Sequence, residues 1–96
     1  MLTAIDIEQK LRSLKPLIRE KFFVRKIGYF GSFAVNEQKE DSDVDILVEF
    51  AQPLGWEFFD LADLLENELQ RKVDLVSIKA LKPQLRDAIL EEVKYV

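Results

Sequence analysis

Two short segments of the chain hold residue types that chemistry on phosphates requires. Gly31 and Ser32 follow an apolar run that ends at Phe30, while Asp43 and Asp45 open the next apolar run. Gly31 permits a positive φ and a close approach of phosphate to the backbone, and the Ser32 hydroxyl adds a hydrogen bond. Because side chains alternate along a strand, the two aspartates share a face with Cα atoms roughly 6.5–7 Å apart. The pattern predicts a phosphate-holding turn beside a Mg²⁺ site, since Mg²⁺ takes one or two carboxylates and leaves positions for phosphate oxygens.

A third carboxylate, Asp74, lies near the start of the apolar run 73–78. If that run pairs beside residues 43–50, Asp74 completes a site for two ions. One ion would hold a triphosphate and the other would activate an attacking hydroxyl. An Asp at a strand entrance is also a common turn or solvent-facing residue, and the sequence leaves both readings of Asp74 open.

Other phosphate- and metal-binding motifs fit the chain less well. Asp41, Asp43 and Asp45 match the first three ligands of an EF-hand, but Ile46 stands where that loop needs glycine and Gln52 where it needs a bidentate glutamate. Asp41 is therefore expected to be an ordinary loop residue. The chain has neither a Walker lysine motif nor a G-x-S-x-G elbow, so it gives no support to P-loop or esterase chemistry.

The composition narrows the possible chemistry further. The 96 residues include no His and no Cys, which excludes Ser-His-Asp hydrolysis, His-ligated zinc and thiolate catalysis. A net charge of −4 argues against direct nucleic-acid binding. No apolar stretch reaches membrane-spanning length, so we expect one domain over residues 1–96 of a soluble cytoplasmic protein. The hydrophobic share of 48% is high for this size, so part of it is expected at an interface, including that of a homo-oligomer.

The first half of the chain predicts a helix, a strand and a short helix. Thr3 and Asp6 resemble a capping pair, and apolar residues recur at helical spacing as far as Phe22. Pro16 interrupts that spacing, so a kink or a break is expected near Lys15. Residues 24–30 predict a strand that ends at Gly31. A short helix over 32–36 and a polar loop to residue 42 follow.

The second half predicts two strands that alternate with two helices. Residues 43–50 form a strand with Val44, Ile46, Val48 and Phe50 on one face. Residues 56–70 form a helix that buries Phe58, Leu61, Ala62, Leu65 and Leu69. Residues 73–78 form a third strand, and a helix starting at Pro83 has an apolar stripe of Leu85, Ala88, Ile89 and Val93. The order predicts an α/β (α+β) fold with a small mixed sheet covered by helices.

These motifs resemble the minimal nucleotidyltransferases of the DNA polymerase β superfamily. The family signature is Gly-Ser, about ten residues, then Asp-x-Asp, which Gly31, Ser32 and 43–45 match. The likeness extends over nearly the whole chain. It implies a polymerase β-like core in which Asp43 and Asp45 bind Mg²⁺, Asp74 completes the metal site, and Gly31 and Ser32 meet the triphosphate of ATP.

Small members of this family are commonly encoded beside a HEPN-domain ribonuclease and act as its antitoxin. The resemblance implies AMP transfer from ATP to a tyrosine of that toxin. Typical members read Gly-Ser-x-Ala-Arg-Gly-Glu, whereas this chain has Val35 and Asn36 in place of Arg-Gly. An arginine there would neutralise developing phosphate charge, which valine cannot do. Nearby Lys39 is a candidate substitute.

Three functional hypotheses follow. The first is an enzyme in which Asp43, Asp45 and Asp74 support Mg²⁺-dependent nucleotidyl transfer. The second is a binding module that silences its HEPN partner by contact alone through a degenerate site. The missing arginine and the apolar residues at 56–59 favour this alternative. The third is transfer to a small molecule, for which 96 residues leave no acceptor-binding domain unless a dimer supplies the missing wall.

Overall fold

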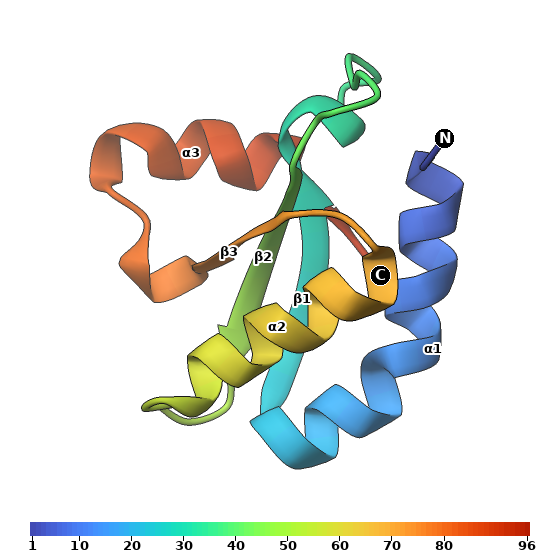
Figure 1. Ribbon diagram of the computed structural model, residues 1–96. Helices are drawn as coiled ribbons and strands as arrows, with labels where there is room; N and C mark the ends of the chain where they lie inside the picture. Colours follow the sequence, from blue (N-terminus) through green and yellow to red (C-terminus); the bar gives the residue numbers. More distant parts are fainter.

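The computed structural model describes residues 1–96 as a four-stranded mixed sheet with helices on both sides (Figure 1). Strand order in the sheet is β3-β2-β1-β4. This confirms the predicted fold class. It places β2, which contains Asp45 and directly follows Asp43, in the interior of the sheet. The elements are α1 (Ala4–Phe22), β1 (Val24–Phe30), the 3₁₀ turn η1 (Gly31–Phe33), β2 (Val44–Phe50), α2 (Glu57–Leu69), β3 (Val73–Ser77), the 3₁₀ turn η2 (Ile78–Ala80), α3 (Pro83–Glu92) and β4 (Lys94–Tyr95).

Pairing between the strands brings distant parts of the chain together. β1 and β2 are antiparallel, with Phe30 opposite Asp45, and β2 and β3 are parallel, with Asp45 opposite Asp74. The condition set for Asp74 by the sequence, pairing of its strand with residues 43–50, is therefore met. The two-residue strand β4 pairs antiparallel with β1 and places Tyr95 opposite Gly28. β4 was not anticipated, because two residues after a helical pattern give no period-2 signal.

The main core lies between the sheet and the helices α1 and α2, which lie on the same face of the sheet in Figure 1. Val44, Ile46 and Val48 are fully buried, as their alternation predicts, while Phe50 is only half-buried. Leu47 is also fully buried but does not belong to this main core, because its side chain lies on the other face of β2. From α2 the core takes three leucines, and the expected core residues Phe58 and Ala62 are half-buried. The buried leucines are Leu61, Leu65 and Leu69.

Helix α1 begins at the predicted capping box, in which the Thr3 hydroxyl accepts the Asp6 N–H and the Asp6 carboxylate accepts the Thr3 N–H. The helix continues through Pro16 without the break that the sequence allowed, although its axis bends in its second half (Figure 1). A proline costs one backbone hydrogen bond and crowds the preceding turn. Burial of Leu14 and Ile18 on either side of Pro16 holds the helix together.

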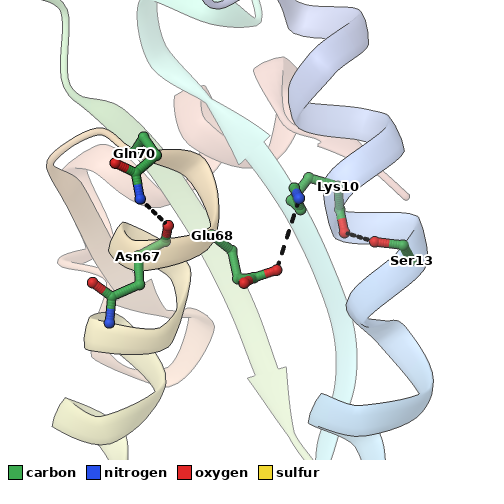
Figure 2. A network of polar contacts seen from close by, with 5 residues as sticks. All are labelled: Lys10, Ser13, Asn67, Glu68 and Gln70. Carbon is green, nitrogen blue, oxygen red and sulfur yellow. Dashed lines mark hydrogen bonds and ion pairs between the residues drawn. The ribbon is translucent and has the colours of Figure 1, made fainter.

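Helices α1 and α2 also meet through an exposed ion pair. Figure 2 shows Lys10 of α1 reaching Glu68 of α2, with 3.8 Å between Nζ and Oε1. Beside it, Ser13 and Gln70 each donate a side-chain hydrogen bond to a backbone carbonyl of their own segment. A solvent-exposed pair of this kind contributes well under about 1 kcal/mol, so apolar packing holds the two helices together.

Helix α3 differs from its prediction. None of its residues is buried, and two members of the expected apolar stripe, Leu85 and Ala88, are exposed. Ile89 and Val93 are half-buried, so the helix contacts the rest of the protein mainly towards its C-terminal end. The stripe was expected to cover the sheet, but in Figure 1 α3 lies apart from α1 and α2, on the other side of the sheet. None of the helices combines the length and the hydropathy that a membrane-spanning segment requires.

Candidate active site

Gly31 and Asp45 are in direct contact at the point where β1 ends and β2 begins. Gly31 has φ +72°, and an ideal Cβ built on it would lie 2.0 Å from Asp45 Oδ2. Only glycine can therefore occupy this position while the Asp45 carboxylate keeps its place. The contact follows from the antiparallel register, which places Phe30 opposite Asp45. The glycine turn and the acidic strand thus form one structural unit, as their spacing predicted.

The other two candidate acids lie beside Asp45. Asp74 is its direct partner across the parallel β2–β3 pair, and Asp43 precedes the first residue of β2. Asp43 and Asp74 are exposed, whereas Asp45 is half-buried. In the present rotamers no three acidic side chains are close enough together to hold a metal ion. The predicted carboxylates therefore share one region of the sheet without forming a closed ligand shell.

The electrostatics of this region concentrate on Asp45. Burial, followed by the nearby charges of Asp74, Asp43 and Glu92 in that order of importance, raises the pKa of its carboxyl to about 6. Like charges at short range disfavour ionisation unless a cation compensates them. Oxygen donors of this kind suit Mg²⁺, which accepts few carboxylates and keeps its remaining positions for water and phosphate. The chemistry of the donor set therefore fits a hard divalent cation.

Glu92, the last residue of α3, belongs to the same site and was missed by the sequence analysis. Its Oε1 accepts a hydrogen bond from the Gly31 N–H at 2.6 Å. It also contributes to the raised pKa of Asp45. The two residues are 61 positions apart in the chain, so no local motif could have connected them. The chain end brings them together, because β4 pairs with β1 directly after α3.

The segment between the glycine turn and β2 is less helical than predicted. Helical structure stops at Phe33 after one 3₁₀ turn, in place of the expected helix over 32–36. Asn36 has φ +59°, a left-handed conformation that favours glycine and tolerates asparagine. Asn36 therefore suits a position where the pattern that the sequence resembles has glycine. Val35 is 46% exposed and leaves no cation at its position.

One guanidinium does lie next to the acidic residues. Arg71 donates a hydrogen bond from Nη1 to the carbonyl of Ser42, at 2.8 Å, one residue before Asp43. The structure thus directs the Arg71 side chain to the loop that enters β2. The loop's own lysine, Lys39, is exposed, and its backbone N–H donates to the Ser42 hydroxyl.

The arrangement combines a backbone donor, a hydroxyl and a row of carboxylates at one end of the sheet. Gly31 supplies an N–H that now binds Glu92, and Ser32 is half-buried next to it. Carboxylates alone repel a phosphate, so this set can act on one only with a cation between them. A hydroxyl acceptor and a phosphorylated donor are the substrates that such a site suits.

Comparisons with known proteins identify the family and the fold. The model of the nucleotidyltransferase domain family matches residues 7–96. The chain is 47% identical to the protein adenylyltransferase MntA of Thermococcus cleftensis over 97 residues, covering 100% of this chain and 98% of that protein. A solved structure of a proposed minimal nucleotidyltransferase superposes with a TM-score of 0.83 at 30% identity and covers 97% of this chain and 95% of the other. A crystal structure of a toxin–antitoxin with AMP-PNP aligns with a TM-score of 0.71 at 28% identity, covering 98% of this chain and 72% of the other.

Proposed function

This chain belongs to the nucleotidyltransferase domain family, and we propose that it is an antitoxin that transfers AMP from ATP to a tyrosine hydroxyl of a HEPN-domain ribonuclease toxin. The 47% sequence identity to a protein adenylyltransferase, which extends over the whole chain, supports the reaction class. Structural similarity to a toxin–antitoxin bound to AMP-PNP supports the biological role and the nucleotide. The direct contact of Gly31 with Asp45, and the pairing of Asp45 with Asp74, is the observation on which the proposal rests.

In the proposed reaction each part of the site has one task. The Gly31 N–H and the Ser32 hydroxyl bind oxygens of the triphosphate, so Glu92 must leave the Gly31 N–H when ATP binds. Asp43, Asp45 and Asp74 hold Mg²⁺, which requires the exposed side chains of Asp43 and Asp74 to turn towards Asp45.

Bound Mg²⁺ would neutralise phosphate charge and lower the pKa of the acceptor hydroxyl. The chain's own residues contribute by positioning: the glycine turn and the carboxylates orient the α-phosphate towards the acceptor oxygen. That oxygen forms a bond to the α-phosphorus, the bond to the bridging oxygen breaks, and pyrophosphate leaves. The hydroxyl proton passes to solvent or to one of the carboxylates.

A second candidate function is supported by Val35. Because an exposed valine stands where the family pattern has arginine, developing phosphate charge lacks one stabilising group. In this alternative the chain silences its partner by forming a complex and transfers nothing. Arg71, whose guanidinium is hydrogen-bonded to the loop beside Asp43, is the cation that the structure offers in compensation.

The two functions are separated by label transfer. The chain is incubated with Mg²⁺, ATP labelled at the α-phosphate, and the HEPN-domain product of the adjacent gene. We expect label on the partner with the natural chain and with Asp41→Asn, a variant of an exposed loop acid, and none with Asp45→Asn. If the natural chain transfers no label and Asp45→Asn still inhibits the ribonuclease activity of the partner, inhibition by contact alone is established instead.

A further inference from the structure

The start of helix α2 exposes two large aromatic side chains at the opposite end of β2 from the candidate active site. Trp56 is 83% exposed and Phe59 is 58% exposed, and their rings contact each other with 5.8 Å between centroids. Phe59 also meets Phe58 edge to face, and Phe58 meets Phe50 in the same way. These four residues, here called the aromatic face, form a continuous row from the sheet to the solvent. Exposed tryptophan and phenylalanine in contact are typical of a surface that another molecule covers.

A hollow of about 240 Å³ lies next to the aromatic face. Its size exceeds that of a cavity of about 150 Å³ that accepts a benzene ring, so a bulky apolar side chain fits. Leu54 and Phe58 are half-buried in its wall, so the hollow is already shaped without a partner. Its apolar walls are Phe50, Pro53, Leu54, Phe58 and Ile78, and its rim includes Glu49 and Lys79.

The charges around the aromatic face indicate what covers it. Helix α2 contains five acidic residues and no basic residue. Glu68 pairs with Lys10 at the far end of the helix, whereas the side chains of Asp60 and Asp63 form no ion pair and no hydrogen bond. Trp56, Phe59, Asp60 and Asp63 follow the spacing of a single helical face and are all exposed. This face therefore presents an aromatic anchor beside unpaired negative charge.

Those charges also exclude other occupants. A second copy of this chain would bring the same acids against one another, at a net charge of −4 for each copy. Nucleic acid and anionic membranes carry negative charge, so the acidic helix repels both. The chemistry that remains complementary is a protein surface with Arg or Lys around an apolar side chain.

We propose that the aromatic face docks a basic surface of the partner protein, which inserts an aliphatic or aromatic side chain into the hollow. This rests on the proposed function for the identity of that partner. The aromatic face lies at the C-terminal end of β2, five residues from Asp45, or roughly 16 Å along the strand. Figure 1 shows the start of α2 at the opposite end of β2 from the glycine turn. Docking there leaves Asp43, Asp45 and Asp74 free to meet a separate segment of the same partner.

The test measures binding and transfer with the same proteins. The HEPN-domain product of the adjacent gene is titrated with the natural chain, with Trp56→Ala/Phe59→Ala, and with Leu17→Ala, which removes an exposed apolar side chain from α1. Thermal melting followed by circular dichroism checks that each variant folds. We expect the double variant to bind about 30-fold or more weakly, as loss of an aromatic anchor does, and Leu17→Ala to bind as the natural chain. Charge reversal at Asp60 and Asp63 should slow association several-fold, and added salt should weaken that effect.

In the transfer assay the double variant should raise the KM for the partner and leave the KM for ATP unchanged. Unchanged affinity of the double variant overturns the docking proposal even if AMP transfer proceeds, and so does the absence of any binding by the natural chain. A dimer of the natural chain that Trp56→Ala/Phe59→Ala dissolves also overturns it, because the occupant would be a second copy. If the natural chain binds through the aromatic face but transfers no AMP, the docking proposal stands and the proposed reaction fails.

Discussion

Replacing Asp45 by Asn should stabilise the metal-free protein at neutral pH while abolishing nucleotidyl transfer. Burial, and then the charges of Asp74, Asp43 and Glu92, raise the pKa of Asp45 from 3.8 to about 6. The ionised carboxylate therefore has a higher free energy in the folded state than in the unfolded chain, where it is solvated and far from these charges. Asparagine keeps the shape of the side chain without its charge.

The size of this effect follows from the pKa shift. Each pKa unit corresponds to about 1.4 kcal/mol, and a shift from 3.8 to about 6 therefore sets an upper limit of about 3 kcal/mol. Because Asp45 is only half-buried, solvent screening reduces the expected gain to about 1–2 kcal/mol. The folded state holds the proton more tightly than the unfolded chain does. Stability of the natural chain should thus fall as pH rises from about 4 to about 6, and the advantage of Asn should vanish near pH 4.

Urea unfolding at pH 7.5 and pH 4 measures this difference in the free energy of unfolding. Asp41→Asn serves as the control, since Asp41 is an exposed loop residue. Adding Mg²⁺ at pH 7.5 should stabilise the natural chain and not Asp45→Asn, because only the natural site binds the ion. If Asp45→Asn is less stable than the natural chain at pH 7.5 without metal, the claim that the ionised Asp45 carboxylate destabilises the folded protein is refuted.

Three further perturbations address the glycine turn and its surroundings. Gly31→Ala places a Cβ against the Asp45 carboxylate at φ +72°, so it should lower the free energy of unfolding in urea by about 1–2 kcal/mol and the transfer rate on the order of 100-fold. The control Gly55→Ala, whose Cβ meets its nearest neighbour at 3.5 Å, should change neither. If both variants keep the natural stability and rate, the close contact of Gly31 with Asp45 is contradicted. Glu92→Gln should lower the KM for ATP about threefold to tenfold, because it removes the carboxylate charge that competes with phosphate for the Gly31 N–H. A lower kcat with unchanged KM would instead identify Glu92 as a metal ligand. Val35→Arg should raise kcat on the order of tenfold by restoring a cation, and unchanged turnover would show that the arginine is dispensable here.

Local pattern predicted the elements that form the site. The apolar run that stops at Gly31 located β1 at residues 24–30. Period-2 alternation located β2, and the Asp-x-Asp spacing located its acidic end. Asp74 required a further assumption, that its strand pairs with β2, and the parallel register meets it. These predictions depend on neighbours within a few residues, which a single sequence displays.

The parts that failed depend on contacts between distant segments. Glu92 reaches Gly31 only because β4 draws the chain end against β1, and a two-residue strand has no pattern of its own. The apolar stripe of α3 predicts burial, yet no layer covers Leu85. At Pro16 the sequence left a kink and a break open, and burial on both sides of the proline yields a helix that bends without breaking.

The most direct test of the reaction centre is a crystal structure of the chain with Mn²⁺ and a non-hydrolysable ATP analogue, with the ion located by anomalous scattering. The account predicts an ion bound by Asp43 and Asp45 with Asp74 beside it, a phosphate oxygen on the Gly31 N–H, and the Glu92 carboxylate moved away from that N–H. A nucleotide bound elsewhere, or an ion that does not touch Asp45, would contradict it.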